Sequence, residues 1–202
     1  MRVLVTGHNG YVGSVLVRVL RAAGHDVQGM DTFFFEDCTI GPDERHVPVV
    51  RKDIRDVEVA DLQGLDAVIH LAALSNDPLG EQSPERTHDI NHRGTVRLAR
   101  CAREAGVSRF LFASSCSVYG EGGAEEQLTE DAPLRPVSPY AVSKARAEEE
   151  LAKLGDADFS PCFLRSGTVY GVSPRLRADT VLNNLVCWAH TTGRVRILNQ
   201  GR

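Results

Sequence analysis

The stretch that decides the fold is VLVTGHNGYVG at residues 3–13, close to the N-terminus. It opens with a short apolar run, which is typical of a buried strand, and continues into glycines spaced G-x-x-G-x-x-G. Beyond Gly13, apolar residues continue on one helical face as far as Leu20, and Gly24 then suits a left-handed helix end. The stretch therefore predicts a strand, a glycine-rich turn and a helix, in that order.

This turn has the composition of a phosphate-binding site. Glycine lets the backbone approach a ligand closely, and the first turn of the following helix offers unpaired N–H groups and partial positive charge. We therefore expect the pyrophosphate of a dinucleotide to be bound by Gly7, Asn9, Gly10, Tyr11, Val12 and Gly13. Asp31 lies 18 residues beyond Gly13, where its carboxylate could accept hydrogen bonds from the adenosine ribose. A carboxylate there repels a 2′-phosphate, which favours NAD over NADP, while the alternative is that Asp31 caps a turn.

Short apolar runs alternate with helical patterns along most of the chain. This alternation predicts a Rossmann-type α/β fold, a doubly wound parallel sheet with helices on both faces. The expected strands are 2–5, 26–30, 47–51, 67–70, 110–113 and 159–164. The expected helices are 11–23, 83–105, 139–154 and 179–190, and a loop is expected over 121–136.

Two further segments are expected to meet the cofactor. Asp53 and Ile54 follow the third strand, where the carboxylate could meet the adenine amino group; the alternative is that Asp53 caps a short helix at 56–62. The fourth strand ends in small residues that let a cofactor lie against the backbone, at Leu71, Ala72 and Ala73. His70, just before them, is expected to be a packed strand residue rather than a base.

The composition is that of a globular domain and excludes several other classes. Of the 202 residues, 42% are apolar and 25% charged, and no run approaches the roughly 18 apolar residues of a membrane span. The net charge of −4, without a basic run, gives no footprint for nucleic acid. The five cysteines are scattered without a Cys-x-x-Cys pair, so neither a metal site nor a disulfide framework is predicted. We expect a reduced, cytoplasmic setting.

The stretch SPYAVSK at 138–144 is the second strong motif. Ser138 suits a helix N-cap and the following proline suits the first helical position. Tyr140 and Lys144 are then neighbours on one helix face, where an ammonium group would favour the phenolate and lower the phenol pKa. The alternative is a surface tyrosine and a surface lysine. Glu148, Glu149 and Glu150 are interpreted as a solvated face.

Taken together, these pieces resemble the short-chain dehydrogenase/reductase superfamily, in particular its extended branch of NAD-dependent nucleotide-sugar epimerases and dehydratases. They follow the family's order and cover nearly the whole chain. The matching pieces are TGHNGYVG at 6–13, Asp31, DI at 53–54, HLAA at 70–73, NHRGT at 91–95, FASSCSVYG at 112–120, SPYAVSK at 138–144 and VYG at 169–171.

The resemblance implies a catalytic set of Ser115, Tyr140 and Lys144. It also implies that Tyr140 and Lys144 contact the cofactor, that Ser115 and Tyr140 contact the substrate, and that Asn184 contacts a nucleotide diphosphate. Ser114 and Ser117 remain neighbouring alternatives for the serine role.

The resemblance also bears on three more residues. Asn91 matches an asparagine that is mainly structural in this branch. Arg175 and Arg177 could pair with a diphosphate, although a polar face on a helix or loop is favoured for them.

The reaction expected from the resemblance is 4-epimerisation of a nucleotide sugar. Related 4,6-dehydratases place an Asp-Glu pair after the catalytic threonine, but Cys116 and Ser117 stand here, and neither can act as a carboxylic acid. The alternatives are a 4-keto reductase, dehydrogenase or dehydratase of the same family, and a non-catalytic NAD-binding sensor or scaffold domain.

The resemblance also implies how the chain is organised. Residues 1–172 are expected to form the NAD-binding domain, and 173–202 the start of a truncated substrate-binding domain, since family members run well past Arg202. A homodimer is expected through the helices at 83–105 and 139–154. Three small side chains are expected to allow close approach of the partner subunit there, namely Ala141, Ala145 and Ala147.

Overall fold

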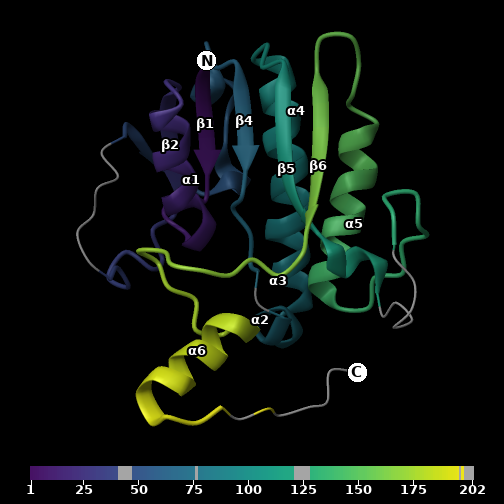
Figure 1. The fold of residues 1–202 in the computed structure, drawn as a ribbon. Coiled ribbons are helices and arrows are strands. Elements are labelled where there is room, and N and C mark those ends of the chain that lie inside the picture. The colour runs from purple at the N-terminus through teal and green to yellow at the C-terminus, as the bar shows by residue number, and fades with distance from the viewer. Residues whose placement is uncertain (41–46, 76, 121–127, 196, 198–202) are drawn as a thin grey trace.

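The computed structural model describes residues 1–40, 47–75, 77–120, 128–195 and 197, and of residues 77–79 it describes the backbone only (Figure 1). A six-stranded sheet has the order β3-β2-β1-β4-β5-β6, and every neighbouring pair is parallel. The strands are β1 Arg2–Thr6, β2 Asp26–Asp31, β3 Val49–Arg51, β4 Ala67–His70, β5 Arg109–Ser115 and β6 Ser160–Ser166. The order reverses between β1 and β4, the point where such sheets bind ligands. The predicted Rossmann-type fold is confirmed.

Helices connect these strands on both sides of the sheet. They are α1 Tyr11–Ala22, α2 Asp77–Gln82, α3 Pro84–His88, α4 Thr95–Glu104, α5 Pro139–Ala152 and α6 Val181–Thr192. Short 3₁₀ helices η1 Ile54–Asp56, η2 Val59–Leu62 and η4 Cys116–Tyr119, and a π-helical turn η3 Asp89–Gly94, complete the set. Right-handed crossovers in opposite directions from the centre place α1 on one face and α4 and α5 on the other.

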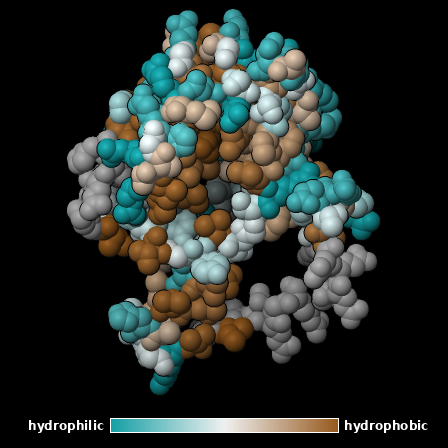
Figure 2. All heavy atoms as spheres, turned by 45° about the horizontal axis from the view of Figure 1, so that its top comes forward, coloured by the Kyte–Doolittle hydropathy of each residue, from teal (hydrophilic) through white to brown (hydrophobic). Residues whose placement is uncertain are grey.

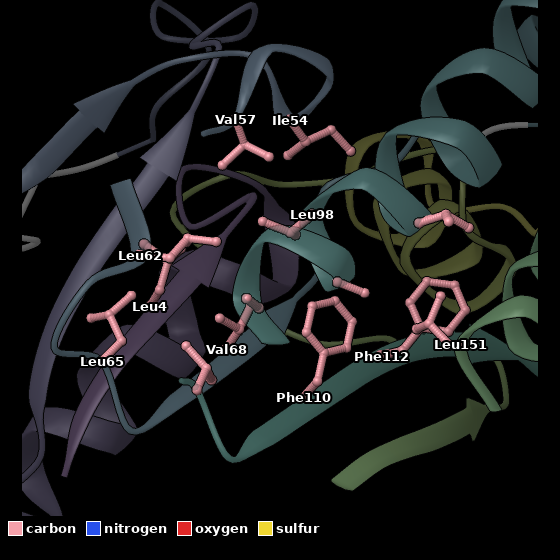
Figure 3. Packing of buried hydrophobic residues seen from close by; sticks show 14 of the residues in the cluster. Leu4, Ile54, Val57, Leu62, Leu65, Val68, Leu98, Phe110, Phe112 and Leu151 are labelled. Carbon is pink, nitrogen blue, oxygen red and sulfur yellow. The ribbon is translucent and has the colours of Figure 1, made fainter. Parts of the chain in front are cut away.

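The core lies in two clusters, one on each face of the sheet. Because successive strand residues point to opposite faces, Leu4 belongs to the cluster that also contains Leu98 of α4 and, at its other end, Leu151 of α5 (Figure 3). Val3 and Val5 pack with Val17 of α1 on the other face. The two layers hold the carboxyl ends of all the central strands at one edge.

The predicted helix over 83–105 is confirmed, with one difference: the backbone stays helical from Pro84 to Glu104, and a π-helical turn lies in its middle. The segment is divided into α3, the π-helical turn η3 and α4, and it is preceded by α2. Ser83 has a non-helical backbone, and Pro84 occupies the first turn of α3, the helical position that proline tolerates. A Cβ on Gly94 would lie 3.1 Å from Ile54 Cδ1, so the end of the π-helical turn sits directly against the core.

Helix α5 corrects two expectations. Ala141 and Ala147 are buried in the chain's own core rather than presented to a partner, while Ala145 is half-buried. The interpretation of 148–150 as a solvated face is wrong for Glu148, whose exposure is 4%. Glu149 is exposed as expected. The physical reason is that Glu148 pairs with an arginine of β6, described below.

The chain beyond β6 runs back across the carboxyl ends of the strands before it reaches α6 (Figure 1). The surface carries many apolar side chains (Figure 2), among them Leu164, Tyr170, Val172 and Trp188. Of the expected loop at 121–136, residues 121–127 lie outside the described residues, and 128–136 form neither helix nor strand. Within the described ranges, no helix has the length and apolarity to cross a membrane.

Candidate active site

The glycine turn joins β1 to α1 and is closely packed against the end of β4. Gly7 has a φ of +71°, and a Cβ there would lie 2.7 Å from the backbone nitrogen of Ala72. A Cβ on Gly13 would lie 2.2 Å from the Gly7 carbonyl oxygen. Gly10 is the N-cap of α1, so the N–H groups of the first helical turn, from Tyr11 onward, have no partner inside the helix. The turn therefore presents N–H donors, and its three glycines carry no side chain that would block a ligand.

Asp31 lies beside this turn as the last residue of β2. Its carboxylate accepts hydrogen bonds from the backbone N–H of Asn9 at 3.0 Å and of Phe33 at 2.9 Å. The second contact is the turn cap considered as an alternative for Asp31, so the structure shows that role as well. Each carboxylate oxygen retains capacity for a ribose hydroxyl. The glycine cradle, the helix terminus and this carboxylate fit NAD.

The residues after β3 and β4 are placed differently from one another. Asp53 caps η1 by accepting from the N–H of Arg55 at 2.8 Å, and the Arg55 guanidinium holds the pKa of Asp53 below its ordinary value. The side chain of Ile54 belongs to the core, so only its backbone could meet a cofactor. The residues that follow β4 are half-buried, namely Leu71, Ala72 and Ala73. Of these, Ala72 lies beside the glycine turn. The adenine contact of Asp53 stays a prediction.

His70 is a packed strand residue, as predicted. Its ring lies between Thr6 Oγ1, at 2.7 Å from Nδ1, and Thr95 Oγ1, at 2.8 Å from Nε2. Complete burial, with a smaller effect of the Lys144 charge, lowers its pKa to about 3. Asn91 is structural too, because its amide both donates to and accepts from the backbone of Leu74, at 2.9 and 2.8 Å.

Lys144 lies beneath Tyr140 on α5 and is not a surface residue. Its side chain is 2% exposed, and Nζ donates to the carbonyl oxygen of Ala113 in β5 at 2.7 Å. Nζ lies 5.7 Å from the centroid of the Tyr140 ring. Burial lowers the pKa of Lys144 to about 7, although the negative charge of Glu148 opposes the shift. The strand behind it thus fixes the ammonium group at 5.7 Å from the centre of the Tyr140 ring.

Ser115 is the last residue of β5, two positions beyond Ala113. Its Oγ accepts from the N–H of Ser117 at 3.2 Å and from the hydroxyl of Ser117 at 2.9 Å. A hydroxyl has two acceptor positions and one donor, so the Ser115 proton remains available for a substrate oxygen. Ser114 is buried and donates to Glu148, on the other face of the strand. Ser114 and Ser117 already donate their hydroxyl protons, to Glu148 and to Ser115 respectively, so Ser115 is the serine whose proton these bonds do not use.

Sequence reasoning missed an ion pair between the buried Glu148 and the partly buried Arg165. The guanidinium of Arg165 donates from Nη2 to Oε2 at 2.6 Å and from Nε to both carboxylate oxygens at 3.1 Å. Arg165 Nη1 also donates to the hydroxyl of Tyr119 at 2.9 Å. The pair thus joins α5, β6 and the turn that follows Ser115. One signal was available: Glu148 stands one helical turn after Lys144.

The structure brings Asn183, rather than Asn184, to the glycine turn. Asn183 Nδ2 donates to the hydroxyl of Tyr11 at 3.0 Å, and its Oδ1 accepts from the N–H of Gly171. Asn184 is partly exposed and donates to the carbonyl oxygen of Ala178 at 3.0 Å. Its diphosphate contact stays a prediction. Arg177 Nη1 donates to the hydroxyl of Ser75 at 3.1 Å.

Comparison with known proteins places the chain in a family. The model of the NAD dependent epimerase/dehydratase family matches residues 3–202. The chain belongs to this family. NAD is the cofactor of the family, in agreement with the fit of the glycine turn and Asp31. Within the described residues, no group of three or more His, Cys, Asp or Glu side chains could hold a metal ion.

Three relatives show how far the similarity extends. A UDP-glucose 4-epimerase of Mycolicibacterium smegmatis is 38% identical over 184 residues, which is 85% of this chain and 57% of that protein. The solved structure of MoeE5 with UDP-glucuronic acid and NAD is 38% identical, with a TM-score of 0.78 over 93% of this chain and 61% of that one. An NDP-hexosamine 5,6-dehydratase, TunA, is 28% identical with a TM-score of 0.87, over 99% and 65%. The chain thus spans about three fifths of these relatives.

Proposed function

We propose that this chain carries the cofactor domain and the catalytic residues of an NAD-dependent nucleotide-sugar 4-epimerase. The observation that carries the proposal is the placement of Lys144. Its Nζ is buried against β5, lies 5.7 Å from the centre of the Tyr140 ring and donates to Ala113, two residues before Ser115. A binding module has no need of a buried lysine beneath a phenol. The epimerase names among the relatives support the same choice.

Each of the three side chains has a role that follows from its surroundings. Tyr140, as the phenolate, takes the proton of the sugar 4-hydroxyl. The Lys144 ammonium favours that phenolate, since an opposite charge nearby stabilises the ionised form. Ser115 donates a hydrogen bond to the sugar oxygen and keeps its proton. When bound, NAD supplies a hydride acceptor that can return the hydride to the opposite face of C4.

A 4-keto reductase or a dehydratase is the second candidate. The similarity to TunA favours a dehydratase, because that protein's structure matches nearly the whole chain. Against it, Cys116 and Ser117 occupy the start of η4, directly after Ser115, and neither supplies the acid and base that elimination needs. Epimerisation requires only the hydride and the proton transfers that Tyr140, Lys144 and Ser115 support.

The test is an assay of the whole chain with NAD on a panel of UDP- and other nucleotide sugars. We expect interconversion of 4-epimers without net change at 340 nm, the absorbance of reduced nicotinamide. Tyr140→Phe should abolish turnover and keep the wild-type dissociation constant for NAD. Net formation of reduced cofactor would support a dehydrogenase instead, and net consumption of added reduced cofactor with a 4-keto sugar would support a reductase. A 4-keto-6-deoxy or 5,6-unsaturated product would support the dehydratase, and full activity of the variant would refute the role of Tyr140.

Two organisational proposals accompany the function. We place the domain division at 172/173, although Ser173 and Arg175 bond back to the N-terminal domain.

We also propose a homodimer through the outer faces of α4 and α5, without the buried alanines Ala141 and Ala147. Light scattering tests the dimer, because a monomeric mass at assay concentration would contradict it.

A further inference from the structure

A segment far along the chain is bonded to the glycine turn. After β6 the chain crosses the ends of the strands toward α1 (Figure 1). The hydroxyl of Tyr11 donates to the carbonyl oxygen of Gly171 at 2.8 Å. The hydroxyl of Ser173 donates to the carbonyl oxygen of Tyr11 at 2.7 Å and lies 3.0 Å from the hydroxyl of Ser14. We call residues 171–177 the crossing segment.

Arg175 is the buried residue of the crossing segment, with 5% exposure. Its guanidinium donates from Nη2 to the side-chain oxygen of Asn9 at 2.9 Å. Nη1 donates to the carbonyl oxygen of Glu36 at 2.6 Å and also to that of Phe35. One side chain therefore joins the glycine turn to the segment that follows β2.

Asp31 holds the same two segments from the other side. It accepts from the N–H of Asn9 and from the N–H of Phe33. Phe33 has a φ of +60°, a left-handed conformation that is unfavourable for a bulky side chain and persists only where contacts on several sides enforce it. Ile40 N–H adds a bond to the carbonyl oxygen of Pro174 at 2.8 Å, so the strained segment is bonded to the crossing segment at two places.

We propose that Arg175 is a positioning residue for the adenosine half of the NAD site. It fixes Asn9 and residues 33–36 around Asp31, so that the carboxylate is held ready for the ribose and the Phe33 turn keeps its shape. The affinity for the adenosine moiety then depends on a residue that does not itself belong to the nucleotide-binding motifs. The proposal rests on NAD as the cofactor and is independent of the reaction performed on the sugar.

Arg177 provides a matched control on the same segment. It is also an arginine, two positions further along, but it donates to the hydroxyl and carbonyl oxygen of Ser75 and pairs with Asp179 at 2.6 Å. Its loss removes an equal charge from the crossing segment without releasing Asn9 or residues 33–36. A general effect of charge or of segment stability would therefore appear in both variants.

The experiment measures the dissociation constants of ADP and NAD by calorimetry for the wild type, Arg175→Met, Arg175→Lys and Arg177→Met. We expect Arg175→Met to weaken both ligands by about tenfold, equivalent to about 1.4 kcal/mol. Lysine cannot reach the three oxygens at once, so Arg175→Lys should fall between. Arg177→Met should bind ADP within twofold of the wild type. Wild-type affinity for ADP in Arg175→Met, or an equal loss in Arg177→Met, would overturn the proposal.

A second measurement keeps the proposal testable if Arg175→Met does not fold. Hydrogen exchange of the wild-type chain is followed with and without saturating ADP. If Arg175 couples the segments, ADP should slow exchange at Asn9 and Phe33 and, together with them, at Ile40 and Gly171. The N–H of Ile40 bonds to Pro174 of the crossing segment, and Gly171 begins that segment and donates its N–H to Asn183. Protection confined to Asn9 and Phe33 would show that the crossing segment does not position the site.

Discussion

Replacement of Lys144 by methionine should stabilise the fold in a way that depends on pH. The side chain is buried, and its pKa falls from the ordinary 10.5 to about 7. Between those two values the unfolded chain holds the proton and the folded chain releases it, so the stability of the wild type rises with pH across this range. Below pH 7 the cost of the buried ammonium is complete, at about 5 kcal/mol at most. Methionine fills a similar volume and carries no charge.

The magnitude follows from the same two pKa values. As the pH rises from 6 to 9, the wild type should gain about 2.5 kcal/mol of unfolding free energy that the Lys144→Met variant does not gain. The lost hydrogen bond to the Ala113 carbonyl oxygen costs the variant about 1–2 kcal/mol, but this cost does not change with pH. The difference between the two proteins should therefore shrink by about 2.5 kcal/mol across the range, whatever its value at pH 6.

Urea unfolding followed by circular dichroism at pH 6, 7, 8 and 9 measures this difference. Lys153→Met is the control, because Lys153 follows the same helix α5 but is exposed and pairs with Glu149. Its pKa is raised above the ordinary value, so its proton stays bound throughout the range and the pH dependence should match the wild type. Parallel curves for the wild type and Lys144→Met would refute the reasoning that Lys144 is held in the fold at a cost.

Three other perturbations have defined outcomes. His70 keeps a pKa of about 3, so the unfolded chain binds more protons below pH 6.5; unfolding free energy should fall as the pH drops from 6.5 to 4, less steeply in His70→Gln. Glu148→Gln leaves the partly buried Arg165 without its anion, and urea unfolding should show a loss of about 1.5–3 kcal/mol. Gly13→Ala places a methyl group 2.2 Å from the Gly7 carbonyl oxygen, and NAD titration should show at least about tenfold weaker binding, the factor that corresponds to 1.4 kcal/mol.

The variants of Glu148 and Gly13 each have a control variant in the same chain. Glu149→Gln removes an exposed carboxylate and should cost less than about 0.5 kcal/mol. Gly24→Ala strains a φ of +82° where nothing lies within 4 Å of the added methyl group, so it should destabilise the fold and leave NAD affinity unchanged. Equal effects of the paired variants, or a slope in His70→Gln as steep as in the wild type, would contradict the respective explanation.

The first strand, the glycine turn and the first helix were predictable from the spacing of apolar residues and glycines. The apolar run, the glycine spacing and the helical stripe at 3–20 predict β1, the turn and α1, because each feature reports a backbone geometry that neighbouring residues determine. The same holds for the start of α5, where Ser138 accepts from the N–H of Ala141 as an N-cap. His70 and Asn91 were correctly interpreted as structural.

The failures share a physical cause. Ala141 and Ala147 have the small size that suits close approach of a partner, yet both are buried in the chain's own core. Residues 148–150 have the composition of a solvated face, yet Glu148 is buried because Arg165 arrives from another strand. No local pattern contains that partner.

The sequence by itself determined the sheet, the glycine turn, Asp31 and the motif that carries Tyr140 and Lys144, since these depend on spacing within short segments. Only the tertiary structure decided that Lys144 is buried with a lowered pKa, and that Arg175 lies against Asn9. Burial and charge pairing depend on which side chains meet across the fold. Here the two partners can lie up to 166 positions apart, as Asn9 and Arg175 do. Such residues meet only because strands and helices pack together, and no short stretch of sequence contains both.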